Sequence, residues 1–283
     1  MSGTILETKG LTKAFGGLVA VDNIDIVIET GRITAIIGPN GAGKTSLFNL
    51  IAGVYRPTSG DIIFNGRSLK YAPWYAKAIP PKLKQQKLLK VRLERHAPAH
   101  KRTALGIART FQHVNLFGNM SVLENIMTGQ HPRSKYGFFA AALRLPKARR
   151  EEEMINLNAM KYLNMVGLGK HSGKNALSLP LGQQKLLSIA RAMATEPKLI
   201  LLDEPGAGLN ALEKRELSDL IKRIREMGIT VILVEHDMPL VMGIAEWIIV
   251  LDSGRKIAEG TAAQVQKDKK VIAAYLGEET EDA

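Results

Sequence analysis

Residues 38–45 combine the side chains and the spacing that bind phosphate. They read Gly-Pro-Asn-Gly-Ala-Gly-Lys-Thr and match the pattern GxxxxGK[ST] between an apolar run and a helical pattern. Glycines let the backbone curl so that its N–H groups point at phosphate oxygens, and the helix N-terminus adds its dipole. Lys44 would then reach the β- and γ-phosphates, and Thr45 would place a hydroxyl on Mg²⁺. A dinucleotide-binding turn gives Lys-Thr no role, so the segment predicts a nucleoside triphosphate site.

A second segment places two carboxylates after an apolar run. Leu199–Leu202 precedes Asp203 and Glu204 directly, so a buried strand would deliver both acids to the edge of a sheet. Asp203 is expected to hold Mg²⁺ through water, and Glu204 to take the proton of an attacking water. Together with residues 38–45, this pair indicates hydrolysis of a triphosphate.

The elements that must position these segments follow an alternating α and β pattern. Such alternation predicts a parallel sheet with helices on its faces. The first thirty residues alternate as a β portion, with Ile24, Ile26 and Ile28 on one face. Strands are expected at 32–37, 61–64, 107–111, 199–202, 229–234 and 247–251. Helices are expected at 43–53, 121–130, 147–166, 182–195, 211–227 and 237–245, with short ones within 262–276.

Composition sets the class. The chain has 283 residues, of which 45% are hydrophobic and 23% are charged, as in a globular protein. It has no cysteine, which excludes disulfides, thiolate metal sites and cysteine nucleophiles. The N-terminus does not resemble a secretory signal, and no apolar run approaches the ~20 residues that cross a bilayer. These features predict a soluble cytoplasmic protein.

The net charge of +12 is concentrated in one stretch. Residues 70–102 carry ten basic side chains against one acidic side chain. A basic protein can bind nucleic acid, but here the charge is local rather than global.

Five further elements have the order and spacing found in the ATPase subunits of ABC transporters, which the chain resembles over nearly its whole length. In that family they are an aromatic residue that stacks on adenine, a Q-loop glutamine, the signature, the D-loop and a switch histidine. The matching positions here are Phe15, Gln112, 179–183, 207–210 and His236.

The resemblance implies a P-loop α/β core with an N-terminal antiparallel β portion. It implies one ATP-binding domain over 1–283, an inserted helical subdomain at 113–181 and a helical tail at 262–283. The implied reaction is hydrolysis of ATP to ADP and phosphate with Mg²⁺.

The family's site residues map onto this chain in four sets. The nucleotide-binding set is Phe15, Gly38, Pro39, Asn40, Gly41, Ala42, Gly43, Lys44, Thr45 and Ser46. The Mg²⁺ set is Thr45, Gln112 and Asp203. The catalytic set is Lys44, Gln112, Glu204 and His236. The set that completes the ATP site of a partner subunit is Gly182 and Gln183.

A finer resemblance concerns ATPases of branched-chain (hydrophobic) amino-acid importers. It rests on residues 109–117, 235–242, 208–210 and 274–277. Urea importers and polysaccharide exporters share parts of this pattern, so they remain alternatives for the transported solute.

The resemblance also implies partners and a location. The partners are transmembrane permease subunits, a second ABC ATPase subunit and, indirectly, a periplasmic solute-binding protein. The chain would lie at the inner face of the cell membrane, held there by the permease. The rival classes are a non-transport ABC ATPase acting on nucleic acid, which we consider unlikely, and a regulatory module that never hydrolyses ATP.

Position 180 departs from the family pattern. The signature usually carries serine there, whereas this chain has Pro180, which lacks both the hydroxyl and the backbone N–H. One lost charge-assisted hydrogen bond would cost about 1.5–3 kcal/mol of γ-phosphate recognition. We hypothesise that the signature of this chain completes a weaker ATP site than the signature of its partner. The alternative is that the helix dipole and Gly182 suffice.

Residues 70–96 form a basic insertion that related chains replace with a short connection. Aromatic residues stand before the basic run, at Tyr71, Trp74 and Tyr75. A solvated loop, contact with lipid or permease, and binding of single-stranded nucleic acid all fit this composition.

Overall fold

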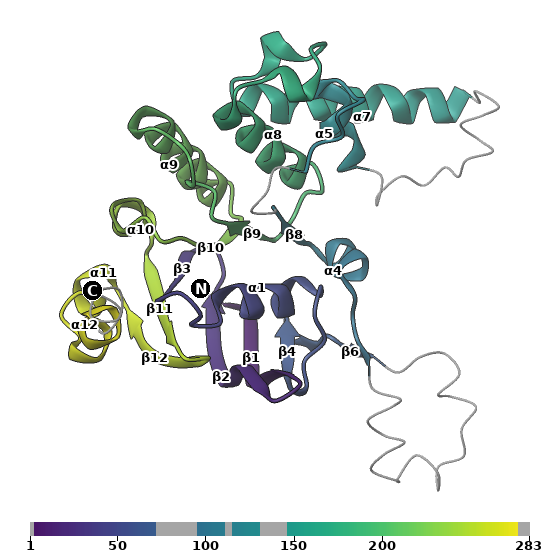
Figure 1. The fold of residues 1–283 in the computed structure, drawn as a ribbon. Helices are drawn as coiled ribbons and strands as arrows, with labels where there is room; N and C mark the ends of the chain where they lie inside the picture. The colour runs from purple at the N-terminus through teal and green to yellow at the C-terminus, as the bar shows by residue number, and fades with distance from the viewer. Residues whose placement is uncertain (1–2, 72–94, 111–114, 131–145, 277–283) are drawn as a thin grey trace, which may run out of the picture. The chain divides into compact units, whose positions relative to one another are not determined.

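The computed structural model describes residues 3–71, 95–110, 115–130 and 146–276. Contacts divide the chain into two compact units, Met1–Arg102 with Ala245–Ala283 and Thr103–Ile244. Each unit has its own strands and helices (Figure 1). Gln112, most of the basic insertion and the last residues of the tail lie outside the described residues. The domain boundaries expected from the sequence therefore stay predictions.

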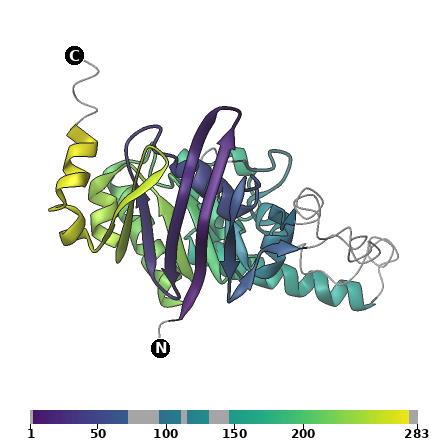
Figure 2. The same cartoon turned by 90° about the horizontal axis from the view of Figure 1, so that it is seen from below.

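An antiparallel sheet forms the first part of unit one. In sheet order its strands are β2 (Leu18–Glu29), β1 (Thr4–Phe15), β4 (Ser59–Phe64) and β5 (Arg67–Ser68). Ile24, Ile26 and Ile28 are all buried, which confirms the predicted face of β2. The long strands β1 and β2 are the two purple strands that run side by side in Figure 2.

Three more strands of unit one position the phosphate-binding segment, residues 38–45. The buried strand β3 (Ile33–Ile37) pairs in parallel with β11 (Trp247–Asp252), which pairs antiparallel with β12 (Arg255–Gly260). The predicted strand 32–37 is thus confirmed as a parallel one, and β3 ends directly before the glycines of residues 38–43.

Helix α1 (Lys44–Ala52) follows those glycines. It ends at Gly53, whose φ of 80° forms a left-handed C-cap, as the sequence predicts. Buried Arg102 donates to the carbonyl oxygens of Leu50 and Ile51 at this end. A cation there complements the helix dipole, and burial lowers the pKa of Arg102 to about 10. The C-terminus of α1 is therefore fixed by a buried charge.

The remaining elements of unit one are short. Strands β6 (Lys70–Tyr71) and β7 (Arg95–His96) pair antiparallel at the two ends of the basic insertion. The tail forms α11 (Ala262–Val265) and α12 (Lys269–Leu276), as expected for 262–276. Helix α4 (Ala99–Leu105) runs across the boundary between the units.

Unit two contains three parallel strands, β8 (Ile107–Arg109), β9 (Leu199–Asp203) and β10 (Thr230–Val234), with β9 between the other two. All residues of β9 and β10 are buried. The helices of this unit are α5 (Val122–Thr128), α7 (Pro146–Met165), α8 (Leu181–Met193), α9 (Ala211–Glu226) and α10 (Met238–Ile244), with 3₁₀ turns η3 (Gly169–His171) and η4 (Ala176–Ser178).

Several elements of the structure were not expected from the sequence, and two of them show why. Strand β12 reads Arg-Lys-Ile-Ala-Glu-Gly and is largely half-buried, so it lacks the clean alternation that marks a strand. Helix α4 buries only Arg102 and has no apolar stripe. Both are visible only through their pairing and packing.

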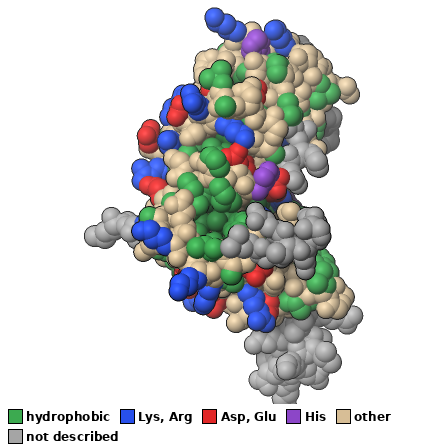
Figure 3. All heavy atoms as spheres, turned by 60° about the vertical axis from the view of Figure 1, so that its left-hand side comes forward, with side chains coloured by type: hydrophobic (Ala, Val, Ile, Leu, Met, Phe, Trp, Pro, Cys, Tyr) green, Lys and Arg blue, Asp and Glu red, His purple; other side chains and the backbone are tan. Residues whose placement is uncertain are grey.

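Charge on the surface is mixed where it can be followed. On the face drawn in Figure 3, acidic and basic side chains of the described residues are interspersed. Residues 72–94 of the insertion, which lie outside the described residues, carry six basic side chains and one acidic side chain.

Candidate active site

The phosphate segment of unit one is a backbone loop that tolerates only glycine at two positions. Gly38 has a φ of 150°, and a Cβ there would lie 2.1 Å from the carbonyl oxygen of Leu251. Gly43 has a φ of 91°, and its Cβ would lie 2.3 Å from the carbonyl oxygen of Ala20. Because neither clash can be relieved by a side-chain rotation, the loop must be built from glycine.

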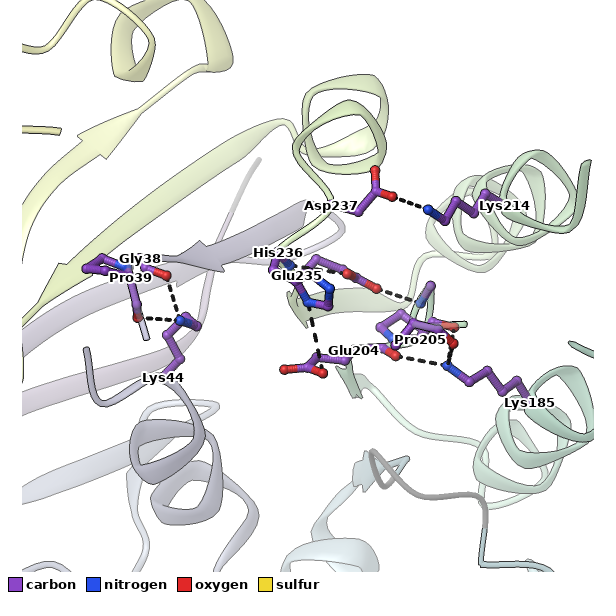
Figure 4. Close-up of polar contacts among 12 residues, drawn as sticks. Gly38, Pro39, Lys44, Lys185, Glu204, Pro205, Lys214, Glu235, His236 and Asp237 are labelled. Carbon is purple, nitrogen blue, oxygen red and sulfur yellow. Dashed lines mark hydrogen bonds and ion pairs between the residues drawn. The ribbon is translucent and has the colours of Figure 1, made fainter. Parts of the chain in front are cut away.

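Lys44 begins α1 and folds back onto this loop. Its Nζ donates to the carbonyl oxygens of Gly38 and Pro39 at 2.6 and 2.7 Å (Figure 4). The ammonium is therefore held over the concave side of the curl, where an anion can take the place of the carbonyls. The structure brings the whole predicted phosphate set together in one turn, comprising Gly38, Pro39, Asn40, Gly41, Ala42, Gly43, Lys44, Thr45 and Ser46.

The predicted base-stacking residue, Phe15, stands at the end of β1. It is 42% exposed. Tyr55 packs edge-on against it with ring centroids 5.2 Å apart, and the Nζ of Lys13 lies 4.7 Å from its centroid. Sequence reasoning missed Tyr55, because an aromatic residue in a loop after α1 carries no signal of its own.

The predicted carboxylates lie in unit two, where β9 and β10 end together. Their parallel register pairs Asp203 with Val234. The residues that follow, Glu204 on one strand and Glu235 and His236 on the other, therefore emerge side by side at the carboxyl edge. That edge is where ligands bind in open α/β sheets.

Asp203 is buried and ion-paired. An Nη of Arg109, from the end of β8, donates to its carboxylate at 2.7 Å, and the two side chains are 12% and 4% exposed. The register of β8 against β9 brings them together. Arg109 lies in one of the family motifs, but we assigned it no role from the sequence alone.

Glu204 and His236, the predicted base and switch residues, face each other across the edge. The Oε2 of Glu204 lies 4.0 Å from the Nδ1 of His236, and the histidine side chain is 66% exposed (Figure 4). Glu204 has a φ of 44°, a left-handed conformation that a non-glycine residue rarely adopts. Such strain is found where the surrounding structure imposes a functional geometry.

Two buried charges adjoin these residues and were missed by the sequence analysis. Burial lowers the pKa of Lys185, on α8, against the opposing effect of the Glu235 and Glu204 charges. Burial raises the pKa of Glu235 against backbone hydrogen bonds that favour the carboxylate. The sequence feature that could have indicated burial of Lys185 is its place among the apolar residues of α8. For Glu235 it is the position directly after an apolar strand.

The signature residues begin helix α8. Pro180 is its N-cap and offers no side-chain cap, while Gly182 and Gln183 lie in the first turn. A Cβ on Gly182 would lie 2.3 Å from the Oε1 of Glu213. Glu213 belongs to the capping box of α9, whose N-cap Asn210 accepts from the amides of residues 212 and 213. Asn210 therefore caps α9.

A groove of about 540 Å³ lies near the end of β8. Thr110, Phe117 and Arg191 are among its lining residues, with Arg191 5.5 Å from the ring of Phe117. Gln112, which follows β8 in the sequence, lies outside the described residues, so its predicted role stays a prediction.

The match to known families places this chemistry in a class. Residues 21–207 match the ABC transporter family. The chain belongs to the ATP-binding cassettes of ABC transporters, as its resemblance predicted. Residues 255–281 also match the branched-chain amino acid ATP-binding cassette transporter family.

Similar proteins of full length support this assignment. The high-affinity branched-chain amino acid transport ATP-binding protein LivG of Escherichia coli (strain K12) is 39% identical over 279 residues, covering 98% of this chain and 100% of that protein. Protein BraF of Pseudomonas aeruginosa, of the same description, has the same identity and coverage. A probable LivG of Archaeoglobus fulgidus is 33% identical, over 96% of this chain and 95% of its own.

Solved structures of ATP-binding cassettes have the same fold. A nucleotide-free cassette from an ABC transporter aligns with a TM-score of 0.77 and 28% identity, over 96% of this chain and 99% of that one. A cassette in its ADP conformation gives a TM-score of 0.77 and 29% identity, over 97% and 99%. These matches confirm the predicted fold class. Among the described residues, no helix is long and apolar enough to cross a membrane.

Proposed function

We propose that this chain hydrolyses ATP to ADP and phosphate and thereby energises a permease that imports branched-chain or other hydrophobic amino acids. One observation carries the hydrolytic part. At the joint end of β9 and β10, a strained Glu204 faces His236 beside the buried Asp203. A module that only binds nucleotide would not need a second carboxylate held in this way.

Each residue of the site has a chemical task in this reaction. The loop of residues 38–43 and Lys44 bind the triphosphate, Phe15 stacks on the base, and Thr45 and Ser46 belong to the first turn of α1. Glu204 accepts the proton of the attacking water, and His236 contacts the γ-phosphate. Gln112 is assigned to sensing the metal and the γ-phosphate by its place in the family motif.

The donor chemistry fits Mg²⁺. Thr45 offers an exposed hydroxyl and Asp203 a carboxylate, and oxygen ligands of this kind are what Mg²⁺ prefers. Thr45, Asp203 and Gln112 would hold the ion. A bound Mg²⁺ would supply Lewis-acid stabilisation of the negative charge that develops on the phosphate oxygens. Arg109 orients the Asp203 carboxylate for this task through their ion pair.

The signature implies a dimer. Gly182 and Gln183 serve the nucleotide of a partner ATPase subunit, which in turn supplies its signature to this chain. We infer that Pro180, which offers neither hydroxyl nor N–H, weakens the site that this chain completes. Pro180→Ser is expected to raise ATP hydrolysis of the assembled transporter, and unchanged hydrolysis would show that Gly182 and the helix end suffice.

The groove near β8 fits a segment of the permease. It is open, mainly apolar and about 540 Å³ in volume, and half-exposed Phe117 contributes to it. Its lining residues Thr110 and Asn115 flank Gln112 in the sequence, so a permease segment bound there would connect the permease to the nucleotide site. In this proposal the permease keeps the chain at the inner face of the membrane, and a periplasmic binding protein delivers the solute.

Amino-acid import is supported by the branched-chain amino acid transport for which the similar proteins are named, and by the family match of residues 255–281. Urea import, polysaccharide export and action on nucleic acid remain the alternative outcomes. The test is uptake of labelled leucine by cells that lack this chain. Wild type and the exposed-site control Glu216→Gln should restore uptake, and Glu204→Gln should not. Uptake restored by Glu204→Gln, or no loss of leucine uptake in the deletion, would contradict the proposal.

A further inference from the structure

A buried lysine forms hydrogen bonds to the backbone at Glu204 and the residues that follow it. Lys185 projects from α8 and is only 7% exposed. Its Nζ donates to the carbonyl oxygens of Glu204 and Pro205, at 3.2 Å each, and to that of Ala207 (Figure 4). Burying an ammonium is costly unless its donors are satisfied, and here three carbonyls of one short segment satisfy it.

A buried anion holds the same segment through its amide groups. Glu235, 1% exposed, accepts from the N–H of Gly206 at 2.5 Å and from that of His236 at 3.2 Å. A Cβ on Gly206 would meet the Oε1 of Glu235 and a methyl group of Leu240, each at 2.9 Å. The segment therefore fits closely against Glu235 and Leu240.

The two charges together define the direction of the Glu204 side chain. Lys185 fixes carbonyls on one side of the segment, and Glu235 fixes an amide between them. The amide of Glu204 is itself bonded to the carbonyl of Val234 at 2.9 Å. With the peptide groups before and after it fixed, Glu204 stays in its left-handed conformation, with its carboxylate 4.0 Å from His236.

The same segment contacts the start of α8. A Cβ on Gly208 would lie 3.4 Å from a methyl group of Leu181, and Gly182 abuts Glu213 at the start of α9. Lys185 stands one turn further along α8. Displacement of the first turns of α8 would thus reach the backbone of Glu204 through a direct hydrogen bond.

We propose that Lys185 and Glu235 are opposed positioning residues that hold Glu204 ready to accept a proton, and that Lys185 transmits the state of α8 to Glu204. This inference rests on the proposed function, in which Glu204 is the general base. Neither residue touches the nucleotide in this account. A purely structural role for the pair differs in its consequence, because it would alter folding and binding as much as turnover.

The test uses the full-length chain, assembled with its partner ATPase subunit and permease, and two independent readouts. The first is steady-state ATP hydrolysis, separated into kcat and KM, and the second is amide hydrogen exchange in residues 204–209. The variants are Lys185→Gln, which is too short to reach the carbonyls, Lys185→Arg, and Glu204→Gln. Gln184→Met is the matched control, since the Gln184 amide bonds only backward, to the carbonyls of Leu177 and Leu179.

Lys185→Gln is expected to lower kcat about 10- to 100-fold, with KM for ATP within about threefold of wild type, because misorientation of a catalytic group acts on turnover. Exchange at residues 204–209 should accelerate. Lys185→Arg should recover most of kcat, and Gln184→Met should match wild type in both readouts.

Wild-type kcat and exchange in Lys185→Gln would overturn the inference, as would a fall in kcat matched by an equal rise in KM. If Lys185→Gln does not fold, the same readouts on Glu235→Gln decide. The proposed function fails separately, if wild type does not hydrolyse ATP or if Glu204→Gln hydrolyses it at the wild-type rate. The exchange readout stands in either case.

Discussion

The guanidinium of Arg109 lies 2.7 Å from the carboxylate of Asp203, and the two side chains are 12% and 4% exposed. The pair joins the ends of two neighbouring parallel strands, at the residue assigned to Mg²⁺. Removing one partner of a buried pair leaves an uncompensated charge. This relationship therefore makes Arg109 important both for stability and for the metal site.

Arg109→Met is expected to lower the free energy of unfolding by about 3 kcal/mol, because the Asp203 carboxylate then stays buried without this partner. Urea unfolding measures the loss. The matched control is Arg255→Met, which breaks the ion pair between Arg255 and Asp22. That pair has the same length, but the side chain of Arg255 is 72% exposed. That exposed pair should contribute about 0.5 kcal/mol or less. Equal losses in both variants would contradict the assignment.

The phosphate loop offers a pair of glycines that separate backbone strain from steric clash. Gly41 and Gly43 both have positive φ, but a Cβ at Gly41 meets no atom within 4 Å. Gly41→Ala should cost about 1–2 kcal/mol of strain alone. Gly43→Ala should cost about 1–3 kcal/mol more, because its Cβ meets a backbone carbonyl.

Nucleotide binding should follow the same order. Titration with a fluorescent ATP analogue is expected to give a larger loss of affinity for Gly43→Ala than for Gly41→Ala. Equal behaviour of the two variants would mean that close contact between the loop and Ala20 is not required.

The N-cap of α9 gives a prediction on stability. The side chain of Asn210 accepts hydrogen bonds from the backbone N–H groups of Leu212 and Glu213. The carboxylate of Glu213 in turn accepts one from the backbone N–H of Asn210. Asn210→Ala should lower the free energy of unfolding by about 1 kcal/mol, whereas Asn210→Asp should be nearly neutral. Thermal or urea unfolding measures both. A larger loss for the aspartate than for the alanine would argue against a capping role.

Burial of Glu235 predicts how stability depends on pH. Its pKa in the folded chain lies above the ordinary value of 4.5, because burial disfavours the carboxylate. The folded state therefore binds the proton more tightly than the unfolded state does. The resulting stability is complete below the ordinary pKa and is lost as pH rises through the folded pKa.

The free energy of unfolding of wild type, minus that of Glu235→Gln, should therefore fall as pH rises above about 4.5 and then level off. Urea unfolding over a series of buffers measures the difference. Glu216→Gln, at an exposed position of α9, should give a difference that does not change with pH. A difference for Glu235→Gln that rises with pH would reverse the sign and contradict the account.

The sequence predicted most of what local chemistry determines. The spacing of residues 38–45 was sufficient for the phosphate loop, because its glycines, lysine and hydroxyl act within one turn. The apolar runs at 32–37, 199–202 and 229–234 were sufficient for three buried strands. Asn210 was recognisable as a cap, because a cap depends on residues three positions apart.

The contacts that arise from strand register and helix packing were not predictable in this way. Arg109 meets Asp203 only because β8 and β9 pair in parallel. Lys185 reads as one polar residue in an amphipathic helix, and only packing shows that it points at the carbonyls after Glu204. The ring of Phe15 packs against that of Tyr55, which lies 40 residues further along the sequence. Long-range pairings of this kind carry no local signal.

The most direct test of the central claim is phosphate release, with ATP and Mg²⁺, by the full-length chain assembled with its partner ATPase subunit and permease. Wild type and Glu216→Gln should release phosphate at similar rates. Glu204→Gln should be slower by about 100-fold or more while still binding ATP, because a lost general base acts on the chemical step. Retention of the wild-type rate by Glu204→Gln would contradict the assignment of Glu204 as the base, and with it this account of the site.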